Sequence, residues 1–138
     1  MSKVSVVIPV KDCANTIERS INSVINQTYK NLEIIVIDNN CKDDTIKKVK
    51  ELSDERIRVV CCKVPGIVPA LNTGLKVCSG DFIARQDGDD YWYPEKLEKQ
   101  LVALESSKAD ICGTQINILN EKLEIVDDNF RYPLRDRP

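Results

Sequence analysis

The fold of this 138-residue chain is constrained most by two long runs of apolar, mainly β-branched residues. They are Val4–Val10 and residues 32–37, and each is long enough to form a strand that is buried on both faces of a sheet. The first run is followed by apolar residues at helical spacing, including Ile17, Ile21 and Val24. Because runs and helical stretches alternate along the chain, we predict a three-layer α/β/α, Rossmann-like domain with a mostly parallel central sheet.

The remaining predicted elements continue this alternation. Further strands are expected at residues 57–61, 81–86 and 111–119, with a short partner at residues 123–126 after a turn. Further helices are expected after Asp43 and Asp44, over residues 69–78, and from Pro94 onward. Asp12 or Asn15 is the expected cap of the first helix. The inward-facing residues expected on the later helices are Ile46, Val49, Leu52, Leu71, Leu75, Cys78, Leu97, Leu101 and Leu104.

Composition excludes several kinds of chemistry. The chain has no histidine, which removes Ser-His and Cys-His catalysis and the commonest transition-metal ligand. Its six cysteines form no Cys-x-x-Cys pair, so we expect reduced thiols rather than a zinc site. The net charge of −2 gives no electrostatic footprint for nucleic acid. No apolar run approaches the roughly 20 residues of a transmembrane helix. We therefore expect a cytoplasmic protein whose chemistry uses carboxylates, lysines, arginines and a hard metal.

A cluster of acidic residues follows the strand predicted at residues 81–86. Asp87, Asp89 and Asp90 lie within four positions, and carboxylates this close repel one another. A divalent cation removes the repulsion, because hard cations take carboxylate oxygens as ligands. Gly88 leaves the backbone free to turn and lets a ligand approach. Taken alone, the same residues are also compatible with a solvated Asp-Gly turn.

Acidic residues also follow the first two predicted strands. Asp12 comes shortly after the first strand, and Asp38 closes the second. Because ligands of parallel α/β sheets bind beyond the carboxyl ends of the strands, we expect these acids and residues 87–90 on one rim. No Gly-x-Gly-x-x-Gly or P-loop pattern follows any strand, which argues against those nucleotide sites.

Several motifs together resemble the family-2 glycosyltransferases with the GT-A fold. The resemblance begins at Val4–Val10 and continues through residues 23–29, 32–38, 70–75 and 79–85. It culminates in Asp87-Gly88-Asp89-Asp90, which matches the DxD motif of that family, followed by residues 94–100. Because the motifs occur in the order and spacing of the family and cover nearly the whole chain, their combination is far more specific than the acidic cluster alone.

The resemblance implies a nucleotide-diphosphate sugar donor, most often a UDP-sugar, bound with Mn²⁺ or Mg²⁺. The residues that it places at the nucleotide-sugar are Pro9, Val10, Asp12, Asp38, Arg85, Asp87, Gly88 and Asp89. Asp89 and Asp87 are expected to bind the metal with Asp90 in support, and Asp38 to hydrogen-bond the base. Arg85 is placed to neutralise phosphate charge, although a structural ion pair explains it equally well. The aromatic residues 91–93 are expected to pack beneath the site more than to stack on a sugar.

The chain also departs from the family pattern. Lys11-Asp12 replaces the usual Tyr-Asn, and residues 39–43 replace an Asp-Gly-Ser-x-Asp run, which leaves the nucleobase open. Family members continue for about another hundred residues, a length typical of a further domain part. We therefore expect a truncated GT-A domain: a donor-binding portion at residues 1–126 and a tail at 127–138 that leads to a missing acceptor region.

That missing region is expected to hold the catalytic base of an inverting transfer, in preference to the late pair Asp127 and Asp128. The alternative functions are a non-catalytic nucleotide-sugar-binding module and a pure interaction domain. The donor sugar, the acceptor (a glycan, a lipid-linked sugar or a protein) and the oligomeric state are not specified by the sequence.

Overall fold

The computed structural model describes residues 2–128, which divide between two compact units at Glu98 and Lys99. The first unit contains a four-stranded sheet with the order β3-β2-β1-β4. Its strands are β1 (Val4–Val10), β2 (Leu32–Asp38), β3 (Ile57–Cys61) and β4 (Phe82–Arg85), and every neighbouring pair is parallel. The helices between the strands are α1 (Ile17–Ile25), α2 (Thr45–Glu51) and α3 (Ile67–Leu75). The predicted fold class, with its mostly parallel sheet, is confirmed.

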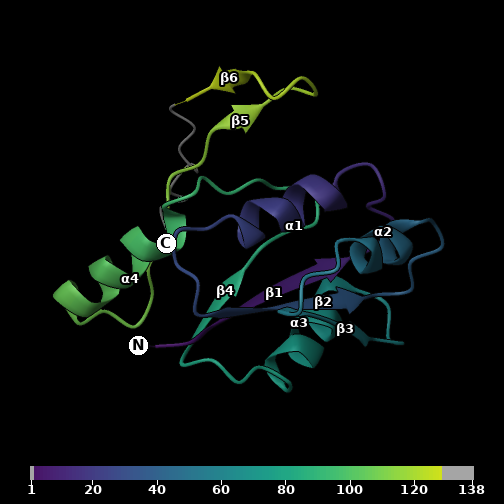
Figure 1. Ribbon diagram of the computed structural model, residues 1–138, viewed down its shortest axis with the longest axis horizontal. Coiled ribbons are helices and arrows are strands. Elements are labelled where there is room, and N and C mark those ends of the chain that lie inside the picture. The colour runs from purple at the N-terminus through teal and green to yellow at the C-terminus, as the bar shows by residue number, and fades with distance from the viewer. Residues whose placement is uncertain (1, 129–138) are drawn as a thin grey trace, which may run out of the picture. The chain divides into compact units, whose positions relative to one another are not determined.

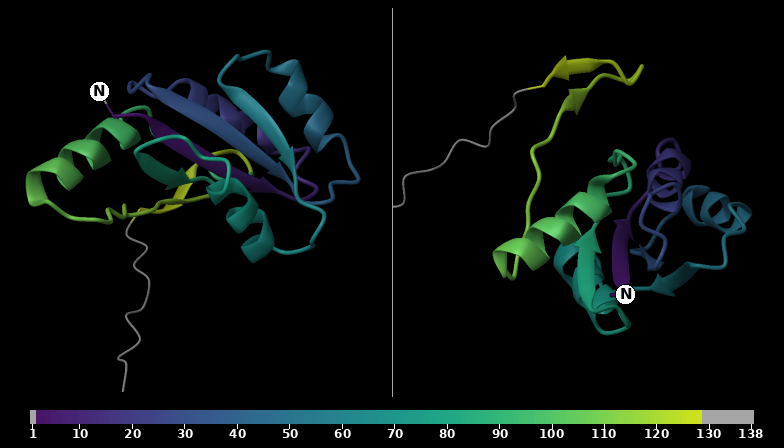
Figure 2. Two further views of the ribbon diagram at one scale, coloured as in Figure 1. Left: turned by 90° about the horizontal axis from the view of Figure 1, so that it is seen from below. Right: turned by 60° about the vertical axis from the view of Figure 1, so that its left-hand side comes forward.

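β1 lies inside the sheet, paired with β2 on one side and with β4 on the other. All seven of its residues are buried. α1 and α2 cover one face of the sheet and α3 covers the other (Figure 1; Figure 2). This layering explains why β1 is apolar on both faces, since each face packs against helices.

The apolar stripe predicted for α1 is fully buried, at Ile17, Ile21 and Val24. The cap predicted for this helix is wrong, because the N-cap residue is Thr16 and not Asp12 or Asn15. Asp12 instead has a φ of 51°, and its carboxylate accepts a hydrogen bond from the backbone amide of Lys42.

α3 packs on the opposite face mainly through small residues, together with the partly buried Leu71, which contacts the core as expected. Ala70 and Gly74 are its buried residues, whereas Leu75, which we expected to face the sheet, is 50% exposed. Gly74 lets the helix approach so closely that a Cβ atom there would lie 2.5 Å from Cγ1 of Val7. The expectation for Leu75 is therefore wrong, because the close contact with β1 is made at Gly74, where there is no room for a side chain.

Gly74→Ala is expected to destabilise the protein by about 1–3 kcal/mol, because the added methyl group must displace Val7 or the helix. Gly113→Ala is the matched control, since a Cβ atom at Gly113 meets nothing within 4 Å. Urea unfolding of both variants measures the difference. A Gly74→Ala variant as stable as Gly113→Ala would contradict the close approach of α3 to β1.

A polar cluster closes the amino-terminal edge of the sheet. The buried hydroxyl of Ser5 donates to Glu33 Oε1 and accepts a hydrogen bond of 2.8 Å from the amide of Gly80. Glu33 also accepts from the amide of Ser79 at 2.8 Å and from Lys3 Nζ at 3.2 Å. Burial alone would raise the pKa of Glu33, but these hydrogen bonds outweigh it and lower the pKa to about 2.

Glu33→Gln is expected to lower the free energy of unfolding at neutral pH by about 1–2 kcal/mol, because a neutral amide replaces a carboxylate that accepts several hydrogen bonds. The folded-state pKa lies below that of the unfolded chain. The contribution of the carboxylate is therefore complete above the unfolded value of 4.5 and is lost as the pH falls through about 2. Urea unfolding as a function of pH should show the wild-type advantage shrinking across this window. A constant advantage would mean that the charge of Glu33 does not contribute.

Beyond the sheet, α4 (Lys96–Ser107) spans the boundary between the units, and β5 (Ile118–Leu119) pairs with β6 (Ile125–Asp127) in an antiparallel hairpin. The expected strand at residues 111–119 is wrong except at its end. No described strand pairs with residues 111–117, and Ile111 is 88% exposed. Among residues 2–128 no helix has the length and apolar character needed to cross a membrane. Most of the predicted tail, residues 129–138, lies outside the described residues.

Candidate functional site

Three loops meet at the carboxyl edge of the sheet, because β1, β2 and β4 are parallel. The first loop is residues 11–16 after β1, and the second is residues 39–44 after β2. The acidic loop is residues 86–93 after β4. The first loop is hydrogen-bonded to both of the others. The structure thus places the acids expected on one rim at one edge: Asp12, Asp38, Asp87, Asp89 and Asp90.

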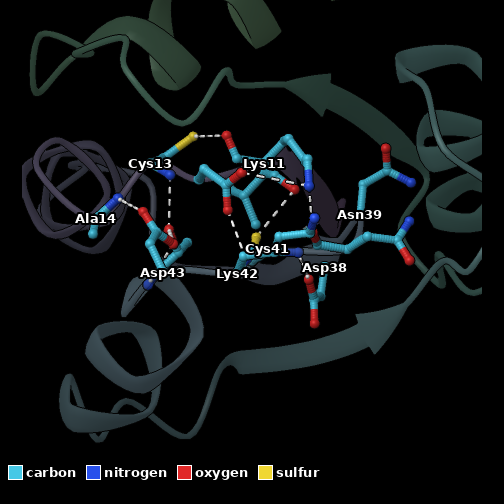
Figure 3. A network of polar contacts seen from close by, with 12 residues as sticks. Lys11, Cys13, Ala14, Asp38, Asn39, Cys41, Lys42 and Asp43 are labelled. Atoms are coloured by element: carbon cyan, nitrogen blue, oxygen red, sulfur yellow. Dashed lines mark hydrogen bonds and ion pairs between the residues drawn. The ribbon is translucent and has the colours of Figure 1, made fainter.

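Side chains and backbone amides join the first loop to the second (Figure 3). Asp12 Oδ1 accepts from the amide of Lys42 at 2.6 Å, and Asp43 Oδ2 accepts from the amide of Ala14 at 2.9 Å. The hydrogen bond from the Lys42 amide is the main cause that lowers the pKa of Asp12. The exposed carboxylate of Asp12 therefore holds the first two loops together, in addition to any role in binding.

Lys11 also connects these loops, whereas Asp38 contacts the second loop alone. Lys11 Nζ donates to the carbonyl oxygen of Asn40 and lies 3.4 Å from Asp12 Oδ2. Asp38 is half-buried at the end of β2, and its Oδ1 accepts from the amide of Cys41 at 2.9 Å. The cationic side chain of Lys11 therefore lies against the second loop.

Arg85 and Asp87 form a two-pronged ion pair at the start of the acidic loop. Arg85 Nε lies 2.9 Å from Asp87 Oδ1, and its terminal NH2 nitrogen lies 3.0 Å from Asp87 Oδ2. The arginine side chain is 54% exposed and the aspartate side chain 40%, so the pair is open to solvent. Of the two explanations for Arg85, the ion pair is present, and it does not prevent a solvent-exposed guanidinium from meeting a phosphate.

The other two acids of this loop are not paired in the same way. Asp89 is exposed, and its carboxylate has no hydrogen-bond or ion-pair partner among the described residues. Burial of the carboxyl group is the largest cause that raises the pKa of Asp90, and the charges of Asp87 and Asp89 raise it further. The repulsion expected from the sequence is thus present, and the side chain best placed to receive a cation is Asp89.

Gly88 serves both a turn and close packing, and the amide of Asp90 donates across this turn to the carbonyl oxygen of Asp87 at 3.2 Å. It is buried and lacks a positive φ. A Cβ atom at this position would lie 3.0 Å from Cys13 Sγ and 3.2 Å from Cγ1 of Val10. Pro9 and Val10 are also buried, as the last two residues of β1. The turn expected at Gly88 is therefore present, and the missing side chain also leaves room for the first loop.

A second possible metal-ligating group lies between the first two loops. Ligand atoms of Asp12, Cys41 and Asp43 all lie within 4.8 Å of one another, and no other such group occurs in residues 2–128. Both carboxylates already accept hydrogen bonds from backbone amides. Burial is the main cause that raises the pKa of the Cys41 thiol to about 11, so the sulfur is protonated and is a poor metal ligand. This donor set fits Mn²⁺ or Mg²⁺ less well than the carboxylates of the acidic loop do.

The aromatic residues of the acidic loop divide between packing and exposure. Trp92 is 5% exposed, and Lys96 Nζ lies 3.9 Å from the centroid of its ring. Tyr91 and Tyr93 are 44% and 54% exposed, and their rings meet edge-on with centroids 6.0 Å apart. The expected packing role fits Trp92, while the two tyrosines present aromatic surface to solvent.

Sequence reasoning missed the side chains that hold the acidic loop. Ser20 Oγ donates to the carbonyl oxygen of Asp87, and Thr16 Oγ1 donates to that of Gly88, each at 2.9 Å. A signal for them was present, because polar residues recur at helical spacing beside the apolar stripe of α1. They are Thr16, Ser20, Ser23 and Gln27.

The raised pKa of Cys41 predicts how fast its thiol reacts with an alkylating reagent. At pH 8 about one Cys41 thiol in a thousand is ionised, so alkylation by iodoacetamide should be slow. Cys61 is exposed and should be alkylated at least about tenfold faster, because accessibility and thiolate character control the rate. Mass spectrometry of peptides at successive times measures both rates. Equal rates would show that the Cys41 thiol is not shielded by the second loop.

Solved structures define the class of protein to which this fold belongs. A mannosyltransferase from Pyrobaculum calidifontis, solved with GDP-Man and Mn²⁺, matches with a TM-score of 0.70 at 25% identity, over 75% of this chain and 32% of that chain. The glucosyl-3-phosphoglycerate synthase of Mycobacterium tuberculosis, solved with Mn²⁺, UDP and glucosyl-3-phosphoglycerate, matches with a TM-score of 0.62 at 29% identity, over 75% and 39%. The described sheet and helices are those of a GT-A glycosyltransferase.

The family follows from the sequence itself. Residues 5–136 match the family Glycosyl transferase family 2, and the chain belongs to it. The UDP-Glc:alpha-D-GlcNAc-diphosphoundecaprenol beta-1,3-glucosyltransferase WfaP of Escherichia coli is 38% identical over 136 residues, which cover 96% of this chain and 53% of the relative. The resemblance predicted from the motifs is confirmed, and the chain spans about half the length of this relative.

Proposed function

We propose that this chain supplies the donor-binding part of a glycosyltransferase that moves a sugar from a nucleotide-diphosphate sugar to a hydroxyl acceptor. The observation that carries the proposal is the acidic loop at the carboxyl edge of the sheet. There Asp89 offers an exposed carboxylate with no partner among the described residues, next to the Arg85–Asp87 pair. Membership of the family supports the same conclusion.

The donor is proposed to be a UDP-sugar. The relative from Escherichia coli is named for UDP-Glc, and the synthase from Mycobacterium tuberculosis was solved with UDP. The nucleoside would lie against the ends of β1 and β2, where Asp38 would accept a hydrogen bond from the base. Pro9, Val10 and Asp12 would border that pocket, with Lys11 as an additional cation beside it.

A divalent cation, Mn²⁺ or Mg²⁺, fits the acidic loop because carboxylate oxygens are the ligands that such ions prefer. Asp89 would be the principal ligand and Asp87 the second, with Asp90 nearby. When bound, the cation would stabilise the negative charge that develops on the diphosphate leaving group. Arg85 would hold Asp87 in place through its two contacts and add positive charge beside the phosphates.

Transfer is proposed to proceed with inversion, which requires a general base on the acceptor side of the sugar. The relative from Escherichia coli is about twice as long as this chain, and we assign the base and the acceptor site to a region corresponding to its remainder. Residues 1–126 would then form the donor-binding portion and residues 127–138 the connection. Donor hydrolysis separates this function from a binding module without turnover, because a module leaves the nucleotide-sugar intact.

Asp89→Asn is expected to abolish metal-dependent nucleotide binding. At about ten times its dissociation constant a ligand stabilises the protein by about 1.4 kcal/mol, which raises the unfolding midpoint by several degrees. Wild-type protein should show this shift with UDP and Mn²⁺ together, and the shift should vanish in Asp89→Asn. Thermal unfolding with UDP, GDP, CDP and dTDP, each with and without Mn²⁺, measures this shift. The nucleotide that gives the largest metal-dependent shift identifies the preferred nucleobase.

Asp81→Asn is the matched control for this experiment. Asp81 is an exposed carboxylate that precedes β4 at the other edge of the sheet, where it accepts a hydrogen bond of 2.8 Å from the Lys3 amide. The control should keep the UDP shift. If Asp89→Asn shows the same shift with UDP and Mn²⁺ as wild type, the proposal that Asp89 binds the metal is wrong.

A further inference from the structure

Side chains supply many of the hydrogen bonds to the backbone of the acidic loop, beside a few from other backbone groups. Residues 86–93 belong to no helix or strand, so their carbonyl groups lack the partners that regular structure supplies. Four successive carbonyl oxygens nevertheless accept a side-chain hydrogen bond. Their donors are Ser20 to Asp87 at 2.9 Å, Thr16 to Gly88 at 2.9 Å, Arg19 to Asp89 at 3.1 Å and Gln86 to Asp90 at 2.9 Å.

The same pattern continues to the end of the loop. The amide of Trp92 donates to Ser23 Oγ at 3.1 Å, and Gln27 Nε2 donates to the carbonyl oxygen of Tyr93 at 2.8 Å. Gln27 Oε1 in turn accepts from the amide of Leu97 at 3.0 Å. The N-cap of α1, the helix itself and Gln27 just beyond its C-cap thus contact most residues of the loop. These residues are called the polar stripe: Thr16, Arg19, Ser20, Ser23 and Gln27.

Ser20 and Gln86 form the centre of this arrangement. Ser20 is fully buried; its hydroxyl donates to Asp87 and accepts from Gln86 Nε2 at 3.0 Å. Gln86 is 1% exposed, and the same nitrogen donates to Asp90. Two side chains therefore tie together the backbone at both ends of the Asp87-Gly88-Asp89-Asp90 segment.

The burial of Gln86 is not accounted for by stability alone. Its Oε1 is buried and has no hydrogen-bond partner within the described part of the chain. A buried amide with one unpaired oxygen is less favourable than an apolar side chain of the same size. The other end of the same amide offsets this cost, because its nitrogen fixes the position of the Asp90 carbonyl relative to Ser20.

We propose that Ser20 and Gln86, supported by the polar stripe of α1, are positioning residues that fix the acidic loop in the shape needed to bind a cation and a diphosphate. The inference rests on the proposed function for its ligand. A loop that is already ordered loses little conformational entropy on binding, so its carboxylates bind a cation more tightly than those of a mobile loop. The polar stripe would thus set metal affinity without touching the metal.

Gln86→Met is the most informative variant, because methionine fills a similar volume and leaves no unpaired buried oxygen. We expect this variant to be at least as stable as wild type while losing the contacts with Ser20 and Asp90. The Mn²⁺ concentration for half-saturation, titrated calorimetrically in the presence of UDP, should rise about tenfold. A loss of affinity of this size corresponds to the net free energy of roughly one hydrogen bond. A residue with a purely structural role would not weaken metal binding while maintaining stability.

Ser20→Ala and Ser5→Ala form a matched pair. Both serines are fully buried, and each hydroxyl donates one hydrogen bond and accepts another, but Ser5 lies at the amino-terminal edge of the sheet. Both variants should lose a similar amount of stability. Amide hydrogen exchange in peptides covering residues 86–93 should accelerate about tenfold in Ser20→Ala and remain unchanged in Ser5→Ala, because only Ser20 restrains that loop.

The outcomes separate the two proposals. If wild type binds UDP with Mn²⁺ and Gln86→Met binds both as wild type does, the positioning role is overturned and the proposed function stands. If wild type does not bind UDP with Mn²⁺, the proposed function fails. Amide exchange still decides whether Ser20 orders the loop, and equal exchange in Ser20→Ala and Ser5→Ala overturns the inference in either case.

Discussion

The parallel pairing of β1 with a strand on each side is the constraint on which the rest of the structure depends. It requires that each strand be followed by a crossover, so three chain segments leave the sheet at the same edge. It also buries β1 completely, which fixes the register of its neighbours through packing on both faces. A site made of loops distant in sequence becomes possible because their starting points are fixed in this way.

The site also depends on how its acidic loop, which belongs to no helix or strand, is held in place. α1 holds it, because two adjacent faces of this helix contact different parts of the molecule. Ile17, Ile21 and Val24 are buried in the core, while the polar stripe engages the backbone of the acidic loop. The helix therefore links the hydrophobic core directly to the acids, and a shift of α1 on the sheet would move the loop with it.

Much of the first unit could be predicted from the sequence. β1, β2 and β3 were found within one residue of their bounds, because short runs rich in β-branched residues between turn and helix signals favour strands. The acids at the carboxyl edge followed from the same reasoning. Features that depend on close approach were not predictable in this way: a leucine was assigned inward in α3, but the contact is made by Gly74.

The remaining errors have a common physical cause. Asp12 has the right chemistry for a helix cap, yet its carboxylate bonds to the Lys42 amide, which is thirty positions away and close only in the folded chain. Residues 111–117 have strand-like composition but no strand beside them among the described residues. Local pattern specifies what a segment is able to do, whereas the partner that it meets decides what it does. The roles of Ser20 and Gln86 belong to the same category.

The polar cluster of Ser5 and Glu33 at the amino-terminal edge of the sheet has a consequence for how this sequence can evolve. It lies at the start of β1, whose seven residues separate it by about 20 Å from the carboxyl edge. This separation exceeds the roughly 8 Å over which charges act in physiological salt, so substitutions at one edge leave the electrostatics of the other almost untouched. Substitutions that adapt the carboxyl edge to a new donor can cost stability, and the amino-terminal edge is a place where compensating substitutions can arise without altering specificity. Stability and recognition can therefore evolve independently at the two ends of the same strand.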